Sequence, residues 1–157
     1  VNYGGILSPF NAWLIARGLS TAPLRMKQHS GTAQEVAEFL ESCPDVRFVW
    51  YPGLKSHPQH DRAIKYMNGQ YSGMISFDIH GDEKTHQKFL ESLHLMPHAV
   101  SLGDIESLIV YYDKNSDKLS HYPKVYQEGF FRFSVGLENA EDVIADLKQA
   151  MKSCGIL

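Results

Sequence analysis

The segment Phe130–Val135 constrains the fold most strongly, because it is a strand-forming run with an arginine at its centre. Alternation divides its side chains between two faces, with Phe131, Phe133 and Val135 on one and Phe130, Arg132 and Ser134 on the other. A guanidinium stays charged and is rarely buried without a partner. Alternation alone favours a solvated sheet face for Arg132, but the planar guanidinium also suits a carboxylate held by two parallel hydrogen bonds.

Helices and strands are expected in mixed order along the chain. Start and stop signals, such as Ser8 followed by Pro9 and a stop at Gly18, combine with hydrophobic periodicity at helical spacing. They predict helices over residues 9–17, 21–42, 58–68, 83–93 and 140–152. Runs of β-branched, aromatic or alternating residues predict strands over 46–51, 72–80, 99–102, 107–112 and 130–135.

This order of elements contains neither a parallel βαβ series nor an internal repeat. It predicts an α+β fold, a two-layer sandwich of a mostly antiparallel sheet with helices on one side. Residues 1–42 contain two expected helices and no strand, which is typical of a connecting element. We therefore expect 1–42 to connect the sandwich, residues 43–157, to an N-terminal domain that this chain lacks. A first residue Val1 rather than methionine agrees with that expectation.

The composition is that of an ordinary globular chain of 157 residues, with 43% hydrophobic and 21% charged residues and a formal net charge of -3. No lysine/arginine cluster points to nucleic acid or anionic lipid as a partner. Cys43 and Cys154 are too far apart for a CxxC motif and too few for a disulfide framework. No run approaches the roughly 20 apolar residues of a membrane helix. We therefore expect a cytoplasmic protein.

Other chemistries have weaker signals. His57 and His60 lack an HExxH motif or a matching carboxylate, so surface histidines at a helix start are favoured over a metal site. For Asp104 and Glu106, a solvated or turn role fits at least as well as a catalytic carboxylate pair. The sequence has no GxxxxGK[ST] or GxGxxG phosphate loop. Ser101 has no ordered His/Asp set around it, so hydrogen bonding to a carboxylate beside an arginine suits it better than nucleophilic attack.

Five ordered blocks carry a resemblance to a known family. They are Leu7–Leu19, Tyr51–His60, Gly73–Phe77, Val100–Leu108 and Arg132–Glu138. Together they resemble the C-terminal part of the cysteine/methionine-metabolism family of pyridoxal-phosphate enzymes, which includes cystathionine γ-synthase, cystathionine lyases, methionine γ-lyase and O-acetylhomoserine sulfhydrylase. The resemblance implies the small C-terminal domain of a fold-type I pyridoxal-phosphate enzyme.

The resemblance also implies three substrate-binding residues. Arg132 matches the arginine that holds the substrate α-carboxylate, and Ser101 matches the serine that assists it. Val100 falls where cystathionine-cleaving members tend to have glutamate and methionine-lyase-like members an apolar residue, which favours methionine or a sulfhydrylase substrate. The family's Ser-x-Ser/Thr-Lys motif is missing from this sequence. Residues that anchor pyridoxal phosphate are therefore expected upstream, and the isolated chain is expected to be inactive.

The favoured interpretation is the substrate-binding domain of a longer, homo-oligomeric enzyme. That enzyme would catalyse γ-elimination or γ-replacement on methionine, cystathionine or a homoserine ester, and the sequence leaves lyase and transferase both open. The main alternative is a non-catalytic truncated remnant that acts as an amino-acid-binding or assembly module. A third is a structural domain whose aromatic face packs on another domain.

Overall fold

A four-stranded antiparallel sheet with the order β1-β2-β4-β3 forms the centre of the molecule. The computed structural model describes residues 5–157, apart from the side chain of Lys118. The strands are β1 (Val46–Trp50), β2 (Met74–Ile79), β3 (Leu108–Tyr112) and β4 (Phe130–Ser134). The helices are α1 (Pro9–Leu19), α2 (Ala22–Ser42), α3 (His60–Met67), α4 (Glu83–Ser92) and α5 (Ala140–Ser153), with short 3-10 helices η1 (Asp117–His121) and η2 (Lys124–Tyr126).

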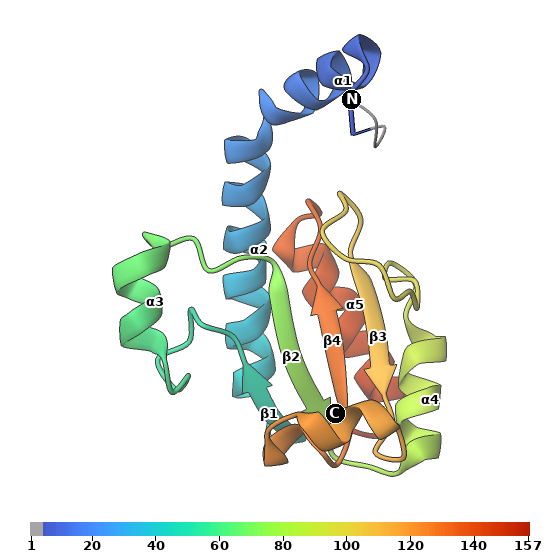
Figure 1. The fold of residues 1–157 in the computed structure, drawn as a ribbon. Coiled ribbons are helices and arrows are strands. Elements are labelled where there is room, and N and C mark those ends of the chain that lie inside the picture. The colour runs from blue at the N-terminus through green and yellow to red at the C-terminus, as the bar shows by residue number, and fades with distance from the viewer. Residues whose placement is uncertain (1–4) are drawn as a thin grey trace.

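The predicted α+β sandwich is confirmed. Helices α2, α4 and α5 form a layer on one face of the sheet, whereas η1 and η2 lie in front of the other face (Figure 1). Segment 113–128, for which the sequence gives no regular element, therefore folds back over the sheet. Tyr126 of η2 contacts the rings of Trp50 and Phe130 there.

Alternation in the strands and periodicity in the helices build the core between the two layers. Its strand residues include Ile75, Phe77, Phe131 and Phe133, and its helix residues include Val36 and Leu40 of α2 and Val143, Leu147 and Met151 of α5. All of these side chains are fully buried. Each large apolar side chain removed from water contributes about 1.5–3 kcal/mol, so this core is the main source of stability.

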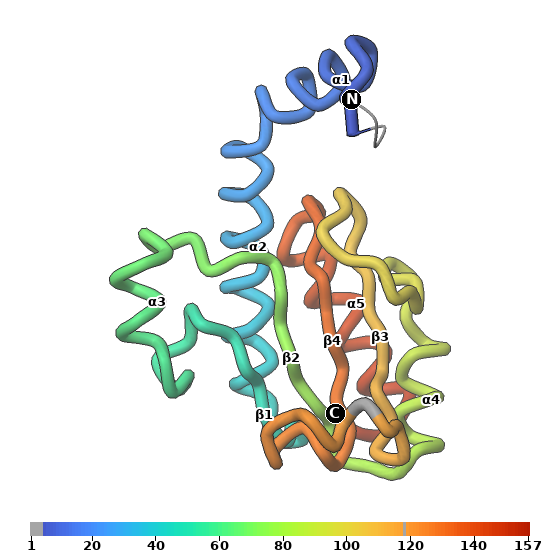
Figure 2. Tube along the Cα trace, in the orientation of Figure 1, coloured from blue at the N-terminus to red at the C-terminus, as the bar shows by residue number. Residues whose placement is uncertain are grey.

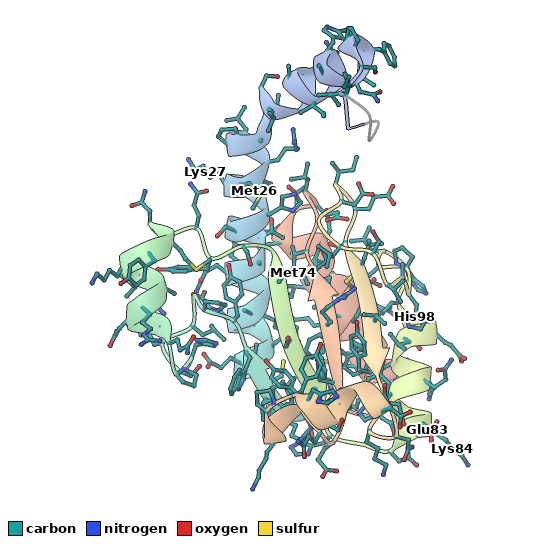
Figure 3. All side chains as sticks on the ribbon, in the orientation of Figure 1. Met26, Lys27, Met74, Glu83, Lys84 and His98 are labelled. Atoms are coloured by element: carbon teal, nitrogen blue, oxygen red, sulfur yellow. The ribbon has the colours of Figure 1, made fainter. Side chains whose placement is uncertain are left out.

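Helix α1 and the first turns of α2 do not join this core. Helix α1 has no buried residue, and burial in α2 begins at His29. The trace turns sharply between the two helices, and Met26 and Lys27 lie on the part of α2 that extends beyond the sheet (Figures 2 and 3). Several large apolar side chains of this arm are exposed, including Phe10, Trp13, Leu14, Ile15 and Leu24. The connecting role of 1–42 stays a prediction.

The predicted strand over 99–102 is wrong. Pairing beside β3 is limited to one bridge between His98 and Ile109. The chain then leaves the sheet edge and turns at Gly103, whose φ is 75°. The carbonyl groups that a strand would have used bond instead to a side chain, that of Arg132.

Two predicted helix boundaries also differ. Helix α1 continues through Gly18, because the hydroxyl of Ser20 donates to the carbonyl of Arg17 at 2.6 Å and caps the end. Helix α3 begins at His60 rather than Pro58, because turn hydrogen bonds occupy the preceding residues. Within residues 5–157, no helix combines the length and apolar character needed to cross a membrane.

Replacement of Phe133 by alanine tests the sheet face assigned to the core. We expect Phe133→Ala to lower the free energy of unfolding by about 3–5 kcal/mol, because it leaves a cavity under the sheet. Tyr66→Ala is the control, since Tyr66 is 74% exposed on α3, and its effect should stay within about 0.5 kcal/mol. Equal losses for both variants in urea unfolding would contradict this assignment.

Candidate functional site

Arg132 lies on the sheet face opposite the α-helical layer, between Ser76 of β2 and Val110 of β3. It is half-buried, and its guanidinium donates only to neutral oxygens. Nη1 donates to the hydroxyl of Tyr112 at 3.1 Å. Nη2 donates to the carbonyls of Val100 at 2.6 Å and Ser101 at 3.1 Å. Arg132 forms no ion pair within residues 5–157.

The guanidinium keeps unused hydrogen-bonding capacity. Its Nε is buried and has no partner within the described part of the chain. A guanidinium carries five N–H donors, and the contacts above use three of them. Leaving a charged group's buried donor unpaired is costly, so this edge of Arg132 suits an anionic oxygen.

The structure brings the three sequence-predicted site residues together, in a way that the sequence did not specify. Val100 and Ser101 reach Arg132 through their backbone carbonyls, whereas the Ser101 hydroxyl makes no hydrogen bond within residues 5–157. The side chain of Val100 is 77% exposed and free to contact another molecule. The assignment of these residues to substrate binding stays a prediction.

A network of hydrogen bonds fixes the loop that carries Val100 and Ser101 against the end of β4. The carboxylate of Glu138 accepts from the backbone N–H and the hydroxyl of Ser107, at 2.7 and 2.8 Å. The same hydroxyl accepts from the N–H of Gly136 at 2.8 Å. Further along, the Ser134 hydroxyl accepts from the N–H of Gly103 at 2.9 Å. The loop is thus held at Gly103 and Ser107, both on the C-terminal side of Arg132's carbonyl partners.

Aromatic rings lie on the same sheet face as Arg132, and one of them, Tyr112, contacts it. Tyr112 stacks on Phe130 across the strand pair, with centroids 5.1 Å apart, and Tyr126 covers Phe130 edge-on at 4.6 Å. Sequence reasoning missed Tyr112, because the alternation of β3 predicts its face only once the pairing with β4 is known. The register Val110 to Arg132 and Tyr112 to Phe130 supplies that information.

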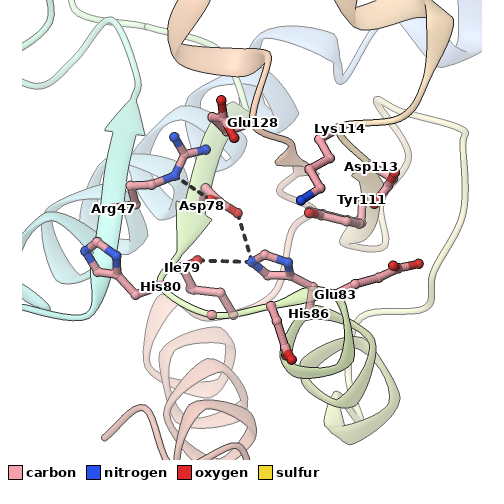
Figure 4. Close-up of a pocket in the computed structure, with 12 residues that line it drawn as sticks. Arg47, Asp78, Ile79, His80, Glu83, His86, Tyr111, Asp113, Lys114 and Glu128 are labelled. Carbon is pink, nitrogen blue, oxygen red and sulfur yellow. Dashed lines mark hydrogen bonds and ion pairs between the residues drawn. The ribbon is translucent and has the colours of Figure 1, made fainter.

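A second polar cluster lies at the end of β2, beside a cavity of about 260 Å³ (Figure 4). Arg47 Nε bonds Asp78 Oδ2 at 2.6 Å, and Asp78 Oδ1 lies 3.3 Å from His86 Nε2. The same nitrogen donates to the carbonyl of Ile79 at 3.0 Å. Asp78 and His86 are almost fully buried. Sequence reasoning missed this cluster, although Asp78 on an otherwise regular strand was a usable signal.

At His86, burial and the interactions with neighbouring residues shift the pKa in opposite directions. Burial alone lowers the pKa of His86, but the hydrogen bonds to Asp78 and Ile79 and the charge of Asp78 outweigh it and raise the pKa above 6.5. Burial raises the pKa of the neighbouring Tyr111 to about 12, so this ring stays neutral beside the imidazole. The cluster is therefore held most firmly when His86 is protonated.

The remaining candidates take structural positions. His60 Nδ1 lies 2.9 Å from the carbonyl of Pro52, and His57 Nδ1 accepts from the N–H of Gln59, which is itself the N-cap of α3. Asp104 accepts from the N–H of its neighbour Ile105. Among residues 5–157, no three His, Cys, Asp or Glu side chains are placed to hold a metal ion.

None of the described lysines is placed to form a Schiff base with an aldehyde cofactor. Every lysine whose side chain the structure describes is exposed. A Schiff-base lysine has to be enclosed and desolvated to react at neutral pH. The residues described here therefore do not fit pyridoxal phosphate by themselves.

The fold is an antiparallel sheet with a helical layer on one face and, on the other face, an arginine without an acidic partner within residues 5–157. Residues 1–152 match the family model described as "Cys/Met metabolism PLP-dependent enzyme". The chain belongs to this family of pyridoxal-phosphate-dependent enzymes. Its fold corresponds to the C-terminal domain of fold-type I members of the class.

Three similar proteins illustrate the match. A canavanine γ-lyase of Pseudomonas canavaninivorans is 44% identical over 154 residues, which cover 96% of this chain and 38% of the relative. An L-methionine γ-lyase of Porphyromonas gingivalis is 44% identical over 158 residues, with the same coverage of 96% and 38%. The crystal structure of cystathionine γ-lyase from yeast superposes with a TM-score of 0.86 at 38% identity and covers 98% of this chain and 41% of that one. The chain thus spans well under half the length of these relatives.

Replacement of Gly136 tests the network that fixes the Val100–Ser101 loop. A Cβ at Gly136 would lie 2.6 Å from the carbonyl carbon of Glu106. We expect Gly136→Ala to lower the free energy of unfolding by about 1–3 kcal/mol, as overpacking does. Gly31→Ala on α2 is the matched control, because a Cβ there meets open space. A melting temperature unchanged by Gly136→Ala would show that the loop is not held as described.

The cluster at His86 predicts a pH dependence of stability. Because the folded pKa is raised, the stabilisation by His86 is fully present below about pH 6.5 and is lost as the pH rises through the folded pKa. The variant His86→Gln keeps a donor and does not titrate. The stability difference between wild type and His86→Gln should therefore shrink as the pH is raised. A difference that grows with pH in urea unfolding would contradict the pKa assignment.

Proposed function

We propose that this chain is the substrate-binding C-terminal part of a longer pyridoxal-phosphate-dependent enzyme, and that Arg132 binds the α-carboxylate of its amino-acid substrate. The observation that supports the proposal most strongly is that one of two arginines has an acidic partner and the other has none among the described residues. Arg47 is neutralised by Asp78, whereas Arg132 donates only to neutral oxygens within residues 5–157. A partly buried guanidinium without a counter-ion favours an anionic ligand.

Arg132 would act by binding and orientation. A hydrogen bond between charged partners contributes about 1.5–3 kcal/mol, and a guanidinium edge holds both carboxylate oxygens in one plane. Fixing the carboxylate also fixes the bonds at the adjacent α-carbon. Arg132 cannot serve as a proton carrier, because its guanidinium stays protonated.

The electron-accepting chemistry would come from pyridoxal phosphate. The described residues offer no enclosed lysine for it. The residues that hold it would belong to the part of the relatives' length that this chain does not span.

The reaction class we propose is γ-elimination or γ-replacement on a sulfur amino acid. Relatives named as L-methionine γ-lyase and O-acetyl-L-homoserine sulfhydrylase support this class. The exposed apolar side chain of Val100 next to Arg132 supports a substrate with an apolar sulfur side chain, such as methionine. Ser101, whose hydroxyl is free within the described residues, would assist at the carboxylate.

Two further features concern location and assembly. Cys43 and Cys154 are free thiols, which fits a reducing cytoplasm. The exposed apolar residues of α1, such as Phe10 and Trp13, support packing against the rest of a longer protein or another subunit of a homo-oligomer.

The test uses the full-length protein with L-methionine. We expect Arg132→Lys to raise KM by roughly 10- to 150-fold, because the planar two-donor edge is lost although the charge remains. Arg62→Lys on the exposed surface of α3 is the control and should leave KM unchanged. A KM unaffected by Arg132→Lys would contradict the carboxylate role. Binding of L-methionine without turnover by the natural full-length protein would favour the remnant over the enzyme.

A further inference from the structure

We propose that Tyr112 is a positioning residue, which sets the orientation of the Arg132 guanidinium that receives the substrate carboxylate. This inference rests on the proposed function of Arg132. Tyr112 provides the only side-chain hydrogen bond to Arg132 within residues 5–157, since the other two acceptors are backbone carbonyls. The orientation of the guanidinium therefore depends on one side chain that a substitution can change.

Tyr112 contacts Arg132 in two ways. Its hydroxyl accepts from Nη1 at 3.1 Å, and the guanidinium carbon lies 5.8 Å from the centroid of its ring. The first contact fixes the rotation of the guanidinium plane, and the second is within the range of an attractive cation–π interaction. Both contacts leave the Nε edge unoccupied.

The ring of Tyr112 is itself held in place. It pairs with Phe130 across β3 and β4 and stacks on it with an interplanar angle of 21°. Phe130 is only 3% exposed and is enclosed by Tyr122 and Tyr126 of the segment that folds over the sheet. A hydroxyl carried by a packed ring has a fixed position, which an exposed polar side chain would not have.

The guanidinium of Arg132 has to be positioned because two loop carbonyls compete with the carboxylate for its donors. Nη2 is engaged by the carbonyls of Val100 and Ser101, so a carboxylate that binds side-on to Nε and Nη2 has to replace one of them. Without Tyr112, the guanidinium would be free to turn toward those carbonyls during the exchange. With the hydroxyl in place, Nη1 stays fixed and the guanidinium plane keeps its orientation during the exchange.

The test compares two probes with the full-length protein, L-methionine and L-methioninamide, which lacks the carboxylate charge. The measured quantity is the ratio of kcat/KM for the acid to kcat/KM for the amide. We expect Tyr112→Phe, which keeps the ring, to lower this ratio roughly 3- to 10-fold through KM, with kcat for the acid nearly unchanged. Tyr112→Leu, which removes the ring as well, should lower it further.

Two controls separate positioning from packing. Tyr122→Phe removes a hydroxyl from the same aromatic cluster without touching Arg132, and it should leave the ratio unchanged. In an Arg132→Lys background, Tyr112→Phe should have no further effect, because Tyr112 acts through the guanidinium.

Each outcome decides between the proposals. A ratio lowered by Arg132→Lys but not by Tyr112→Phe overturns the role of Tyr112 and leaves the proposed function standing. Equal losses of kcat/KM for acid and amide in Tyr112→Phe also overturn it, since packing alone would then explain the effect. A ratio unchanged by Arg132→Lys overturns the proposed function itself.

Discussion

The pairing of β4 between β2 and β3 is the constraint on which the rest of the structure depends. It buries Phe131 and Phe133 in the core and turns Arg132 to the opposite face. A slip of one residue in this register would exchange the two faces and bury the guanidinium without a partner. The burial of apolar side chains in the core therefore also determines the sheet face on which Arg132, the charged residue of β4, lies.

The sheet face opposite the α-helical layer thus carries two arginine sites. They differ in whether an acidic side chain of the chain compensates the positive charge. At the end of β2, Asp78 is paired with Arg47 and lies beside His86, so charge is compensated inside the chain. At the middle of β4, Arg132 has only the oxygens of Tyr112 and the Val100–Ser101 loop. Under the proposed function, this asymmetry separates a structural ion pair at Arg47 from a ligand-binding arginine at Arg132.

Local patterns predicted much of the fold. Alternation placed Phe131, Phe133 and Arg132 on their correct faces, and cap and periodicity signals located most helices, because these features depend on neighbours in sequence. The strand expected at 99–102 failed because a distant side chain takes its carbonyls. Tyr112 was missed for the same reason, since strand register and loop folding are set by contacts far apart in sequence. The family resemblance pointed to Arg132, Val100 and Ser101, but not to Tyr112 or to the backbone carbonyls through which Val100 and Ser101 contact Arg132.

A crystal structure of the full-length protein with a bound unreactive L-amino acid tests the central claim most directly. The expected result has both carboxylate oxygens on the Arg132 guanidinium, one of them at Nε, with a carbonyl of Val100 or Ser101 displaced from Nη2. The contradictory result would be a carboxylate bound elsewhere while Arg132 keeps its hydrogen bonds to both carbonyls.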